Sequence, residues 1–247
     1  FLMELERGGQ GLNLTLQVLD GILAHNGEIL NERLVPVTGK TAEQFLREYE
    51  NCFRIADYSK EIYPMTLEGC LVRVCDIIAY IGRDIEDAIT VGLIKRTDLP
   101  RSIVRVLGDR NDQIINTLAL DVIQQSYGQN YIGFSKDIYR ALQDLKAFNY
   151  EQIYFHPMVK SQDQKIQGLF QSLFRRYVQD IEAQNHSSPI YRHFITNMTP
   201  EYSRKNPPAR IAADFIAAMT DDFFNQQYKD LFFPTRFGLK IHEKKTD

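Results

Sequence analysis

The feature that most constrains the fold is a row of apolar residues at helical spacing between residues 67 and 89. Apolar side chains recur every three or four positions, at Leu67, Leu71, Val74, Ile78, Ile81, Ile85 and Ile89. At about 100° per residue they fall on one face of an α-helix, as a core-facing stripe does. Thr66 is a suitable N-cap and Gly92 a suitable stop, so the pattern predicts one long helix from Thr66 to about Val91.

The other face of this predicted helix carries a carboxylate, a phenol and a second carboxylate at four-residue intervals. Asp76, Tyr80 and Asp84 lie within an arc of roughly 80°, and Arg73 and Asp87 point the same way. A solvated face is one interpretation, but such faces usually pair Glu with Lys at this spacing, and this face has no Lys. Because carboxylates on a largely buried helix need a metal, an arginine or a ligand hydroxyl as partner, the pattern favours a binding face.

Length and composition exclude several classes of protein. The 247 residues are enough for one large or two small domains. A net charge of -3 argues against a broad nucleic-acid-binding surface. No apolar run approaches the ~18 residues that a membrane span needs. Cys52, Cys70 and Cys75 form no Cys-x-x-Cys pair and are typical of reduced thiols, so we expect a cytoplasmic protein.

Helical periodicity extends along most of the chain. Further helices are predicted over residues 14–25, 112–127, 135–148, 162–183, 190–198 and 208–229, and a capping box at residues 41–44 starts a short one. Strand character is confined to residues 33–37 and 237–241. The polar stretch 201–210 is typical of an exposed basic loop, with a phosphate-binding loop as the alternative. We therefore expect an all-α protein.

Three stretches resemble one family of enzymes. Residues 66–87, with Asp76, Tyr80 and Asp84, are similar to the last metal-ligand helix of HD-domain deoxynucleoside triphosphate triphosphohydrolases, the dGTPase-like enzymes. The segment that begins Gly11-Leu-Asn-Leu-Thr15 and continues to Gly27 resembles the part of the bacterial members just before that helix. Residues 209–221 resemble their C-terminal helix. The three matches follow the family's order along the chain.

The resemblance implies an all-α fold with a multi-helix, HD-domain-like core. Residues 1–95 would form the C-terminal part of that core, and residues 96–247 a helical C-terminal region packed on it. The implied activity is hydrolysis of a dNTP, with dGTP as one candidate, to a deoxynucleoside and tripolyphosphate. It would use a divalent metal, either Mg, Mn, Fe or Zn. The implied partners are the deoxynucleoside triphosphate and further copies of the chain in a homo-oligomer.

The resemblance also implies a role for four residues. Asp76 matches the aspartate that completes the metal site, and a carboxylate is a suitable hard ligand for such metals. Tyr80 matches the tyrosine that reaches the substrate phosphates, and Asp84 the acid that hydrogen-bonds the sugar 3′-hydroxyl. Tyr154 resembles the tyrosine that packs on the deoxyribose and leaves no room for a 2′-hydroxyl. An ordinary core tyrosine near a turn is the alternative for Tyr154.

The chain departs from the family pattern in its histidines. The family's metal site needs two further histidines and an aspartate, but no His-Asp dipeptide occurs among the five histidines here. No catalytic residue can therefore be assigned. His25 ends a predicted helix and is either a site residue or a favourable charge at the helix C-terminus. Because the chain begins at Phe1 rather than Met, we expect that upstream sequence is missing.

Two alternatives to the triphosphohydrolase stay open. The first is a degenerate, non-catalytic relative: a helical regulatory or oligomerisation module that keeps the nucleotide pocket as a sensor. The second is an HD phosphohydrolase that acts on another phosphoester. Sequence upstream of Phe1 that contains a His…His-Asp pair would favour the enzyme over the sensor.

Overall fold

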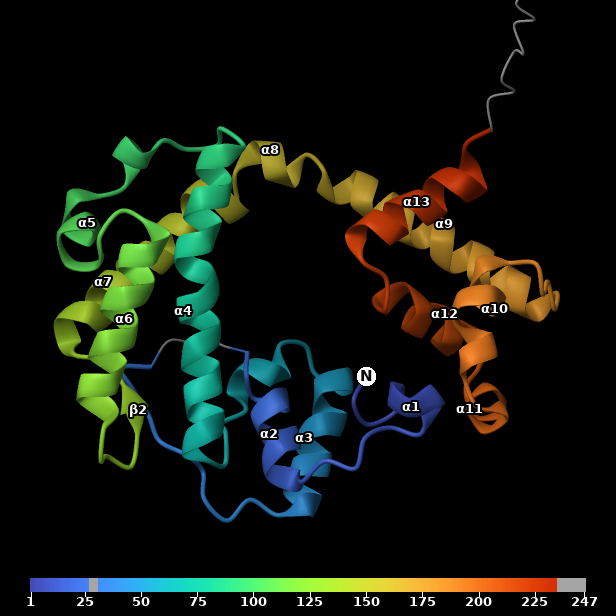
Figure 1. Ribbon diagram of the computed structural model, residues 1–247, viewed down its shortest axis with the longest axis horizontal. Helices are drawn as coiled ribbons and strands as arrows, with labels where there is room; N and C mark the ends of the chain where they lie inside the picture. The colour runs from blue at the N-terminus through green and yellow to red at the C-terminus, as the bar shows by residue number, and fades with distance from the viewer. Residues whose placement is uncertain (27–30, 235–247) are drawn as a thin grey trace, which may run out of the picture. The chain divides into compact units, whose positions relative to one another are not determined.

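The computed structural model describes residues 1–26 and 31–234 (Figure 1). Contacts divide the chain into two compact units, residues 14–161 and residues 1–13 with 162–247, and each is described by itself. The sequence predicts a division at residue 95, whereas the contacts group residues 14–161 together. The long helix that ends before residue 95 packs against helices that follow it. The predicted all-α fold is confirmed, because the strands among the described residues are two residues long each.

The unit of residues 14–161 contains the long helix and most of the predicted site. Its elements are α2 (Leu16–Leu23), β1 (Arg33–Leu34), α3 (Ala42–Arg54), a 3₁₀ turn (Tyr58–Glu61), α4 (Leu67–Thr90), a second 3₁₀ turn (Arg96–Asp98), α5 (Arg101–Leu107), α6 (Asn111–Ser126), β2 (Ile132–Gly133), α7 (Lys136–Asn149), a π-turn (Tyr150–Tyr154) and α8 (Pro157–Lys160). The short strands β1 and β2 pair antiparallel, with Arg33 opposite Gly133. The predicted strand at 33–37 is thus shortened, and that at 237–241 lies outside the described residues.

Helix α4 starts and stops where the sequence predicts. The Thr66 hydroxyl accepts a hydrogen bond from the Gly69 backbone N–H at 3.0 Å, as an N-cap does. At the other end the chain turns at Gly92, whose φ of +76° favours glycine. These caps satisfy backbone groups that a helix leaves unpaired, so α4 forms a rigid element of 24 residues.

The core stripe of α4 differs from the prediction in its first two turns. Leu67 and Leu71 are exposed, and the buried side there is formed by Gly69, Cys70 and Arg73. The reason is the close approach of α2, because a Cβ built on Gly69 would lie 3.4 Å from the Gly21 Cα. The α2–α4 crossing therefore rotates the buried face away from the leucines.

A buried ion network fixes the start of α4. The Lys40 ammonium lies 2.6 Å from Asp20 Oδ1 and 2.8 Å from Glu48 Oε2, and it donates to the Tyr63 carbonyl at 2.8 Å. The other Asp20 oxygen accepts from the Met65 backbone N–H at 2.6 Å. These bonds join α2 and α3 to the residues that precede α4, and they satisfy charges whose burial would otherwise be costly.

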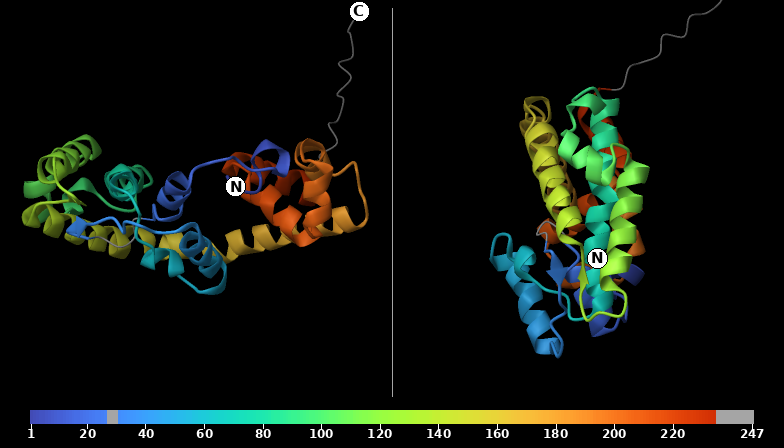
Figure 2. Two further views of the ribbon diagram at one scale, coloured as in Figure 1. Left: turned by 90° about the horizontal axis from the view of Figure 1, so that it is seen from below. Right: turned by 90° about the vertical axis from the view of Figure 1, so that its left-hand side faces the viewer.

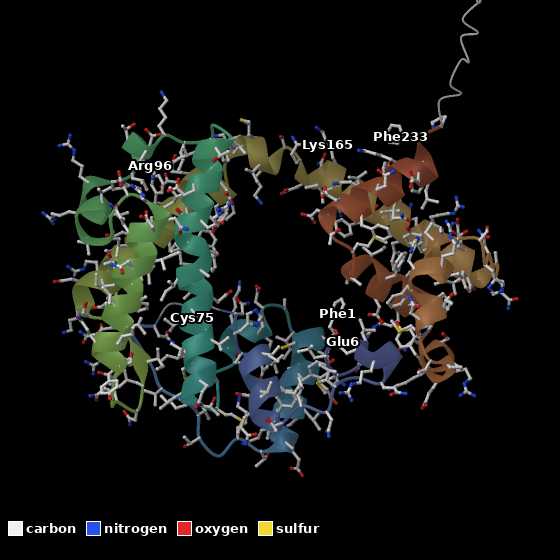
Figure 3. All side chains as sticks on the ribbon, viewed as in Figure 1. Phe1, Glu6, Cys75, Arg96, Lys165 and Phe233 are labelled. Atoms are coloured by element: carbon white, nitrogen blue, oxygen red, sulfur yellow. The ribbon has the colours of Figure 1, made fainter. Side chains whose placement is uncertain are left out.

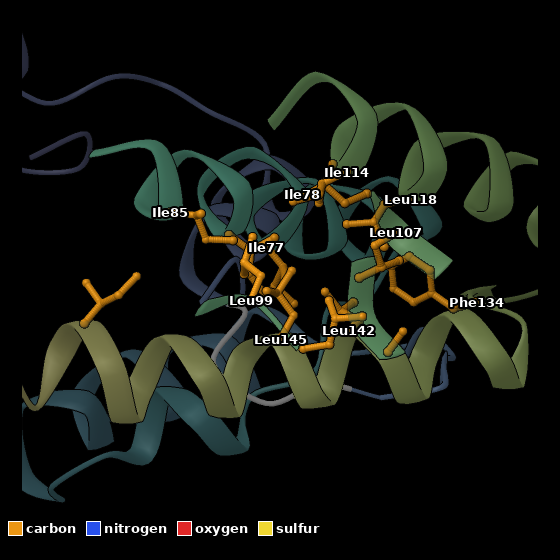
Figure 4. Packing of buried hydrophobic residues seen from close by; sticks show 14 of the residues in the cluster. Ile77, Ile78, Ile85, Leu99, Leu107, Ile114, Leu118, Phe134, Leu142 and Leu145 are labelled. Atoms are coloured by element: carbon orange, nitrogen blue, oxygen red, sulfur yellow. The ribbon is translucent and has the colours of Figure 1, made fainter. Parts of the chain in front are cut away.

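The middle of α4 packs on α6 and α7, and Figures 1 and 2 show α4 and α6 running side by side. Figure 4 shows the side chains that fill this core, which include Ile77, Ile78, Ile85, Leu99, Leu107, Ile114, Leu118, Phe134, Leu142 and Leu145. Each such side chain contributes about 1.5–3 kcal/mol relative to an exposed one. The core thereby holds one face of α4 fixed, and with it the direction of the opposite face.

Arg96, which follows the C-terminal end of α4 and is labelled in Figure 3, connects α4 to the start of α6. Its guanidinium bonds both Glu86 oxygens, at 2.6 and 3.1 Å, and also the Asp109 carbonyl. The Asn111 backbone N–H, at the first residue of α6, donates to Glu86 as well. The Arg96 hydrogen bonds lower the pKa of Glu86 below its usual range.

The described residues of the second unit, 1–13 and 162–234, are also helical. They contain α1 (Glu6–Gly9), α9 (Asp163–Glu182), α10 (Pro189–His193), a 3₁₀ turn (Ile195–Asn197), α11 (Pro200–Lys205), α12 (Pro208–Ala217) and α13 (Asp221–Phe232). Helix α12 packs on α9 around a core that includes Tyr177 and Phe215. No helix in the described residues is both long and apolar enough to cross a membrane.

The basic loop predicted at 201–210 is mostly helix. Thr199 caps α11 by accepting from the Tyr202 N–H at 3.3 Å, and Pro200 occupies its first position. Arg210 belongs to α12, where it binds Asp214 at 2.8 Å and Glu4 at 2.9 Å. The polar and basic side chains of this stretch favoured a loop, so the helix and its cap were not predicted.

Candidate functional site

A cavity of about 450 Å³ lies in the unit of residues 14–161. Helix α4 supplies one wall, with Asp76, Tyr80 and Ile81. The end of α7 and the residues after it supply the other wall, and Asn26 completes the lining. The residues of the second wall are Lys146, Asn149, Tyr150, Tyr154, Phe155 and Lys160. The structure therefore brings three of the four predicted site residues to one cavity.

The second wall depends on a π-turn at the end of α7. The Phe155 backbone N–H donates to the Tyr150 carbonyl at 3.0 Å, five residues earlier, which is the wider bond of a π-turn. Just before this turn, the buried Asn149 donates its amide N–H to the Ile81 carbonyl of α4 at 2.9 Å. This side-chain bond anchors the π-turn on α4, and single π-turns of this kind are frequent at functional sites.

Asp84 lies next to the cavity and is joined to it by Tyr154. The Tyr154 hydroxyl donates a hydrogen bond to Asp84 Oδ2. Among the described residues Tyr154 lines the cavity, whereas Asp84 does not. Burial raises the pKa of the Asp84 carboxyl, and the bond from Tyr154 opposes this rise. Burial and then the Asp84 bond raise the pKa of Tyr154. Both groups thus hold their protons more tightly, and the phenol proton is engaged with Asp84.

Asp76 is half-buried at the cavity, yet the metal site is incomplete within the described residues. These residues contain no group of three His, Cys, Asp or Glu side chains that could hold a metal ion. His25 is exposed, and its Nδ1 lies 2.6 Å from the Ile22 carbonyl near the end of α2. That contact agrees with its interpretation as a helix-end residue. Asp76 is therefore one potential ligand that belongs to no such group in the described part of the chain.

Two lysines bring positive charge to the second wall of the cavity. The Lys146 ammonium lies over the Tyr150 ring, 5.7 Å from its centroid, and the Lys160 ammonium over the Phe155 ring at 5.5 Å. With Asp76 on the other wall, the cavity has an acidic side and a basic side. Ammonium groups among aromatic rings suit a ligand that has both anionic and planar parts.

Comparison with known proteins identifies the family. Residues 132–230 match the model of the phosphohydrolase-associated domain. Deoxyguanosinetriphosphate triphosphohydrolase-like proteins of Caldanaerobacter subterraneus subsp. tengcongensis and Desulfatibacillum aliphaticivorans are each 32% identical to the chain, over 231 and 237 residues. A third, of Clostridium perfringens, is 28% identical over 236 residues. Each alignment covers 94% of the chain, and 55%, 59% and 57% of the respective relative.

This chain belongs to the same family as these proteins. It spans between 55% and 59% of the length of those three dGTP triphosphohydrolase-like relatives. The matched phosphohydrolase-associated domain begins at β2 and includes the second wall of the cavity, while α4 lies before it. The names of the relatives support a phosphohydrolase family, in agreement with the resemblance carried by α4.

Arg73 and Arg83 do not line the cavity. Arg73, predicted to point with Asp76, is fully buried and donates to the Ile62 carbonyl at 2.6 Å. The crossing of α2 turns this side of α4 inward, which explains the error. Arg83 is exposed and pairs with Asp87 at 3.1 Å, one helical turn away.

Most of the second wall was not predicted from the sequence, and Tyr154 is its one predicted site residue. Lys146, Tyr150 and Tyr154 recur at four-residue spacing, like Asp76, Tyr80 and Asp84 on α4. That repetition is a signal that could have found them. Asn149 and Phe155 carry no comparable signal, because their positions depend on the π-turn.

Proposed function

We propose that this chain forms the nucleotide-binding part of a dNTP triphosphohydrolase, which converts a dNTP to a deoxynucleoside and tripolyphosphate. The observation that carries the proposal is the single cavity in which Asp76 and Tyr80 face two lysines and two further tyrosines. A triphosphate needs cationic and hydroxyl donors, and a sugar needs hydrogen-bonding groups beside an apolar surface. The cavity offers both sets of groups. The names of the relatives make dGTP the first substrate to test.

Three lining residues, together with the neighbouring Asp84, have a part in this proposal. Tyr80 and Lys146 would bind phosphate oxygens, the first as a hydrogen-bond donor and the second as a charge. Tyr154 would pack against the deoxyribose, where its ring would exclude a 2′-hydroxyl. Because the Tyr154 proton is engaged by Asp84, the pair offers oxygen acceptors, which suit the 3′-hydroxyl as a donor. Asp84 and Tyr154 would therefore recognise the sugar together.

The described residues supply only some of the ligands that a divalent metal needs. The Asp76 carboxylate is a suitable ligand, but catalytic metal sites in proteins have about three protein ligands. The described residues offer no cluster of that size. We therefore propose Asp76 as one ligand of a metal whose ligand set is incomplete among the described residues. No hydrolytic step is assigned to the residues described here.

The test combines binding and turnover. The full-length protein is incubated with each of the four dNTPs and Mn²⁺ or Mg²⁺, and tripolyphosphate is measured. Release of tripolyphosphate that is lost in Asp76→Ala is the expected result. The Asp76→Ala protein should remain helical by circular dichroism while its metal stoichiometry falls. Absence of tripolyphosphate with all four substrates would overturn the hydrolase proposal.

A non-catalytic nucleotide sensor is the second candidate. The observation that favours it is the lack of a three-ligand cluster in the described part of the chain. A sensor would bind a dNTP with affinity that depends on Tyr80 and Lys146, but would release no tripolyphosphate under any metal condition. Binding without turnover would support the sensor. A homo-oligomeric state, proposed from the family resemblance, is tested separately by sedimentation analysis.

A further inference from the structure

The second wall of the cavity contains three aromatic rings in mutual contact. The Tyr150 and Tyr154 rings meet edge to face at 5.1 Å between centroids, and the Tyr150 and Phe155 rings meet at 5.8 Å with a tilt of 46°. All three belong to the π-turn or follow it directly, so one local turn aims the group at the cavity. We call Tyr150, Tyr154 and Phe155 the aromatic wall.

Phe155 differs from the other two rings in its chemistry and its exposure. Its side chain is 60% exposed although it lines the cavity, while both tyrosines are partly buried. It has no polar atom, so it offers a ligand only the surface of its ring. An exposed aromatic ring in a cavity gains from a planar partner that removes it from water. A sugar or a phosphate is not planar, but a nucleobase is.

We propose that Phe155 is the platform on which the base of the bound nucleotide stacks. This inference rests on the proposed function, and it adds the base to the phosphate and sugar contacts given above. Phe155 directly follows Tyr154, which is assigned to the sugar, so the two rings contact adjacent parts of one nucleotide. Stacking of a base on an aromatic ring changes affinity by about tenfold or more.

Stacking of this kind has a consequence for base selectivity. The ring contacts the face of a base and does not read the hydrogen-bonding groups on its edge. Purines present more surface than pyrimidines, so the platform favours dGTP and dATP over dCTP and dTTP. It does not separate dGTP from dATP. The Lys160 ammonium lies above the same ring. We assign it no role in distinguishing the hydrogen-bonding edges of the bases.

The experiment measures equilibrium affinity by calorimetry in wild type and Phe155→Ala. The ligands are dGTP, dATP, dCTP and inorganic tripolyphosphate, which lacks a base. Phe155→Ala should lose about tenfold or more in affinity for both purines, less for dCTP, and nothing for tripolyphosphate. Phe155→Trp should retain purine affinity. The triphosphate of 2-aminopurine deoxyriboside, whose fluorescence is quenched by stacking, should be quenched by wild type and Phe155→Trp but not by Phe155→Ala.

Met158→Ala is the matched control. Met158 is 61% exposed in α8, three residues after Phe155, and does not line the cavity, so all four affinities should stay unchanged. Wild-type purine affinity in Phe155→Ala would overturn the stacking role while leaving the proposed function intact. If Phe155→Ala lost as much affinity for tripolyphosphate as for the purine nucleotides, the stacking role would also be overturned, since Phe155 would then only shape the cavity. Failure of wild type to bind any dNTP would overturn the proposed function and the platform together.

Discussion

The two walls of the cavity are built in different ways. Helix α4 is a long regular helix with defined caps, and it presents Asp76 and Tyr80 because its opposite face is packed in the core. The second wall lies on an irregular π-turn, and a side-chain bond from Asn149 to the Ile81 carbonyl anchors that turn on α4. The first wall thus follows from periodicity and burial, and the second from a tertiary contact.

The largest effect should come from the core side of α4. Ile85 is 1% exposed, so Ile85→Ala removes packed methyl groups and should lower the free energy of unfolding by about 2–5 kcal/mol. Leu71, on the same helix, is 41% exposed, and Leu71→Ala should cost about 0.5 kcal/mol or less. Urea denaturation measures both. Equal losses in the two variants would contradict the corrected position of the stripe.

The second wall should depend on Asn149. Asn149→Ala removes the buried bond to Ile81 and leaves a small cavity, which should lower the free energy of unfolding by about 1–3 kcal/mol. It should also weaken dGTP binding, because the π-turn that holds Tyr154 and Phe155 loses its anchor. Gln143→Ala, an exposed change on the same helix, is the control for helix propensity. Unchanged dGTP affinity in Asn149→Ala would show that the turn holds its shape without this bond.

These two regions also show how much of the molecule could be predicted from sequence. Helix α4, its Thr66 cap and the placement of Asp76 and Tyr80 followed from spacing and capping alone. The exposure of Leu71 and the burial of Arg73 did not, because the close approach of Gly21 to Gly69 is a tertiary contact between segments distant in sequence. The π-turn could not be predicted from the sequence for a similar reason. Its shape is stabilised by a bond between residues 68 positions apart.

The opposite charges of the two walls should give opposite effects on an anionic ligand. Without metal, Lys146→Met should lower the affinity for tripolyphosphate by about tenfold, since it removes a cation from the cavity. Under the same conditions Asp76→Asn should raise that affinity, because it removes a repelling carboxylate. Lys136→Met, at an exposed position on α7, should have little effect. Calorimetry in a chelating buffer measures all three. A drop in affinity for metal-free Asp76→Asn would contradict this electrostatic description.

The Arg96–Glu86 bond at the end of α4 should have a smaller effect. Both side chains are about one-third exposed, so Arg96→Met should lower the free energy of unfolding at pH 7 by about 1 kcal/mol. The pKa of Glu86 is lowered in the folded state. Its contribution is therefore present above the unfolded pKa and lost as pH falls through the folded pKa. The difference between variant and wild type should shrink in acid. A loss that is unchanged at pH 3 would rule out this charge pairing as its cause.

The subtlest test concerns the bond between the walls, from Tyr154 to Asp84. Burial raises the folded-state pKa of Asp84, so this carboxyl favours folding most below its unfolded pKa, and that contribution is lost as pH rises through the folded pKa. Tyr154→Phe removes the hydrogen bond that opposes the rise, so the pKa of Asp84 should increase further. Carboxyl-carbon NMR titration measures it. The variant should also lose stability relative to wild type as pH rises, and this pH-dependent loss should vanish in an Asp84→Asn background. If the loss persists there, Tyr154 stabilises the fold through its other contacts and the two walls are not linked by this bond.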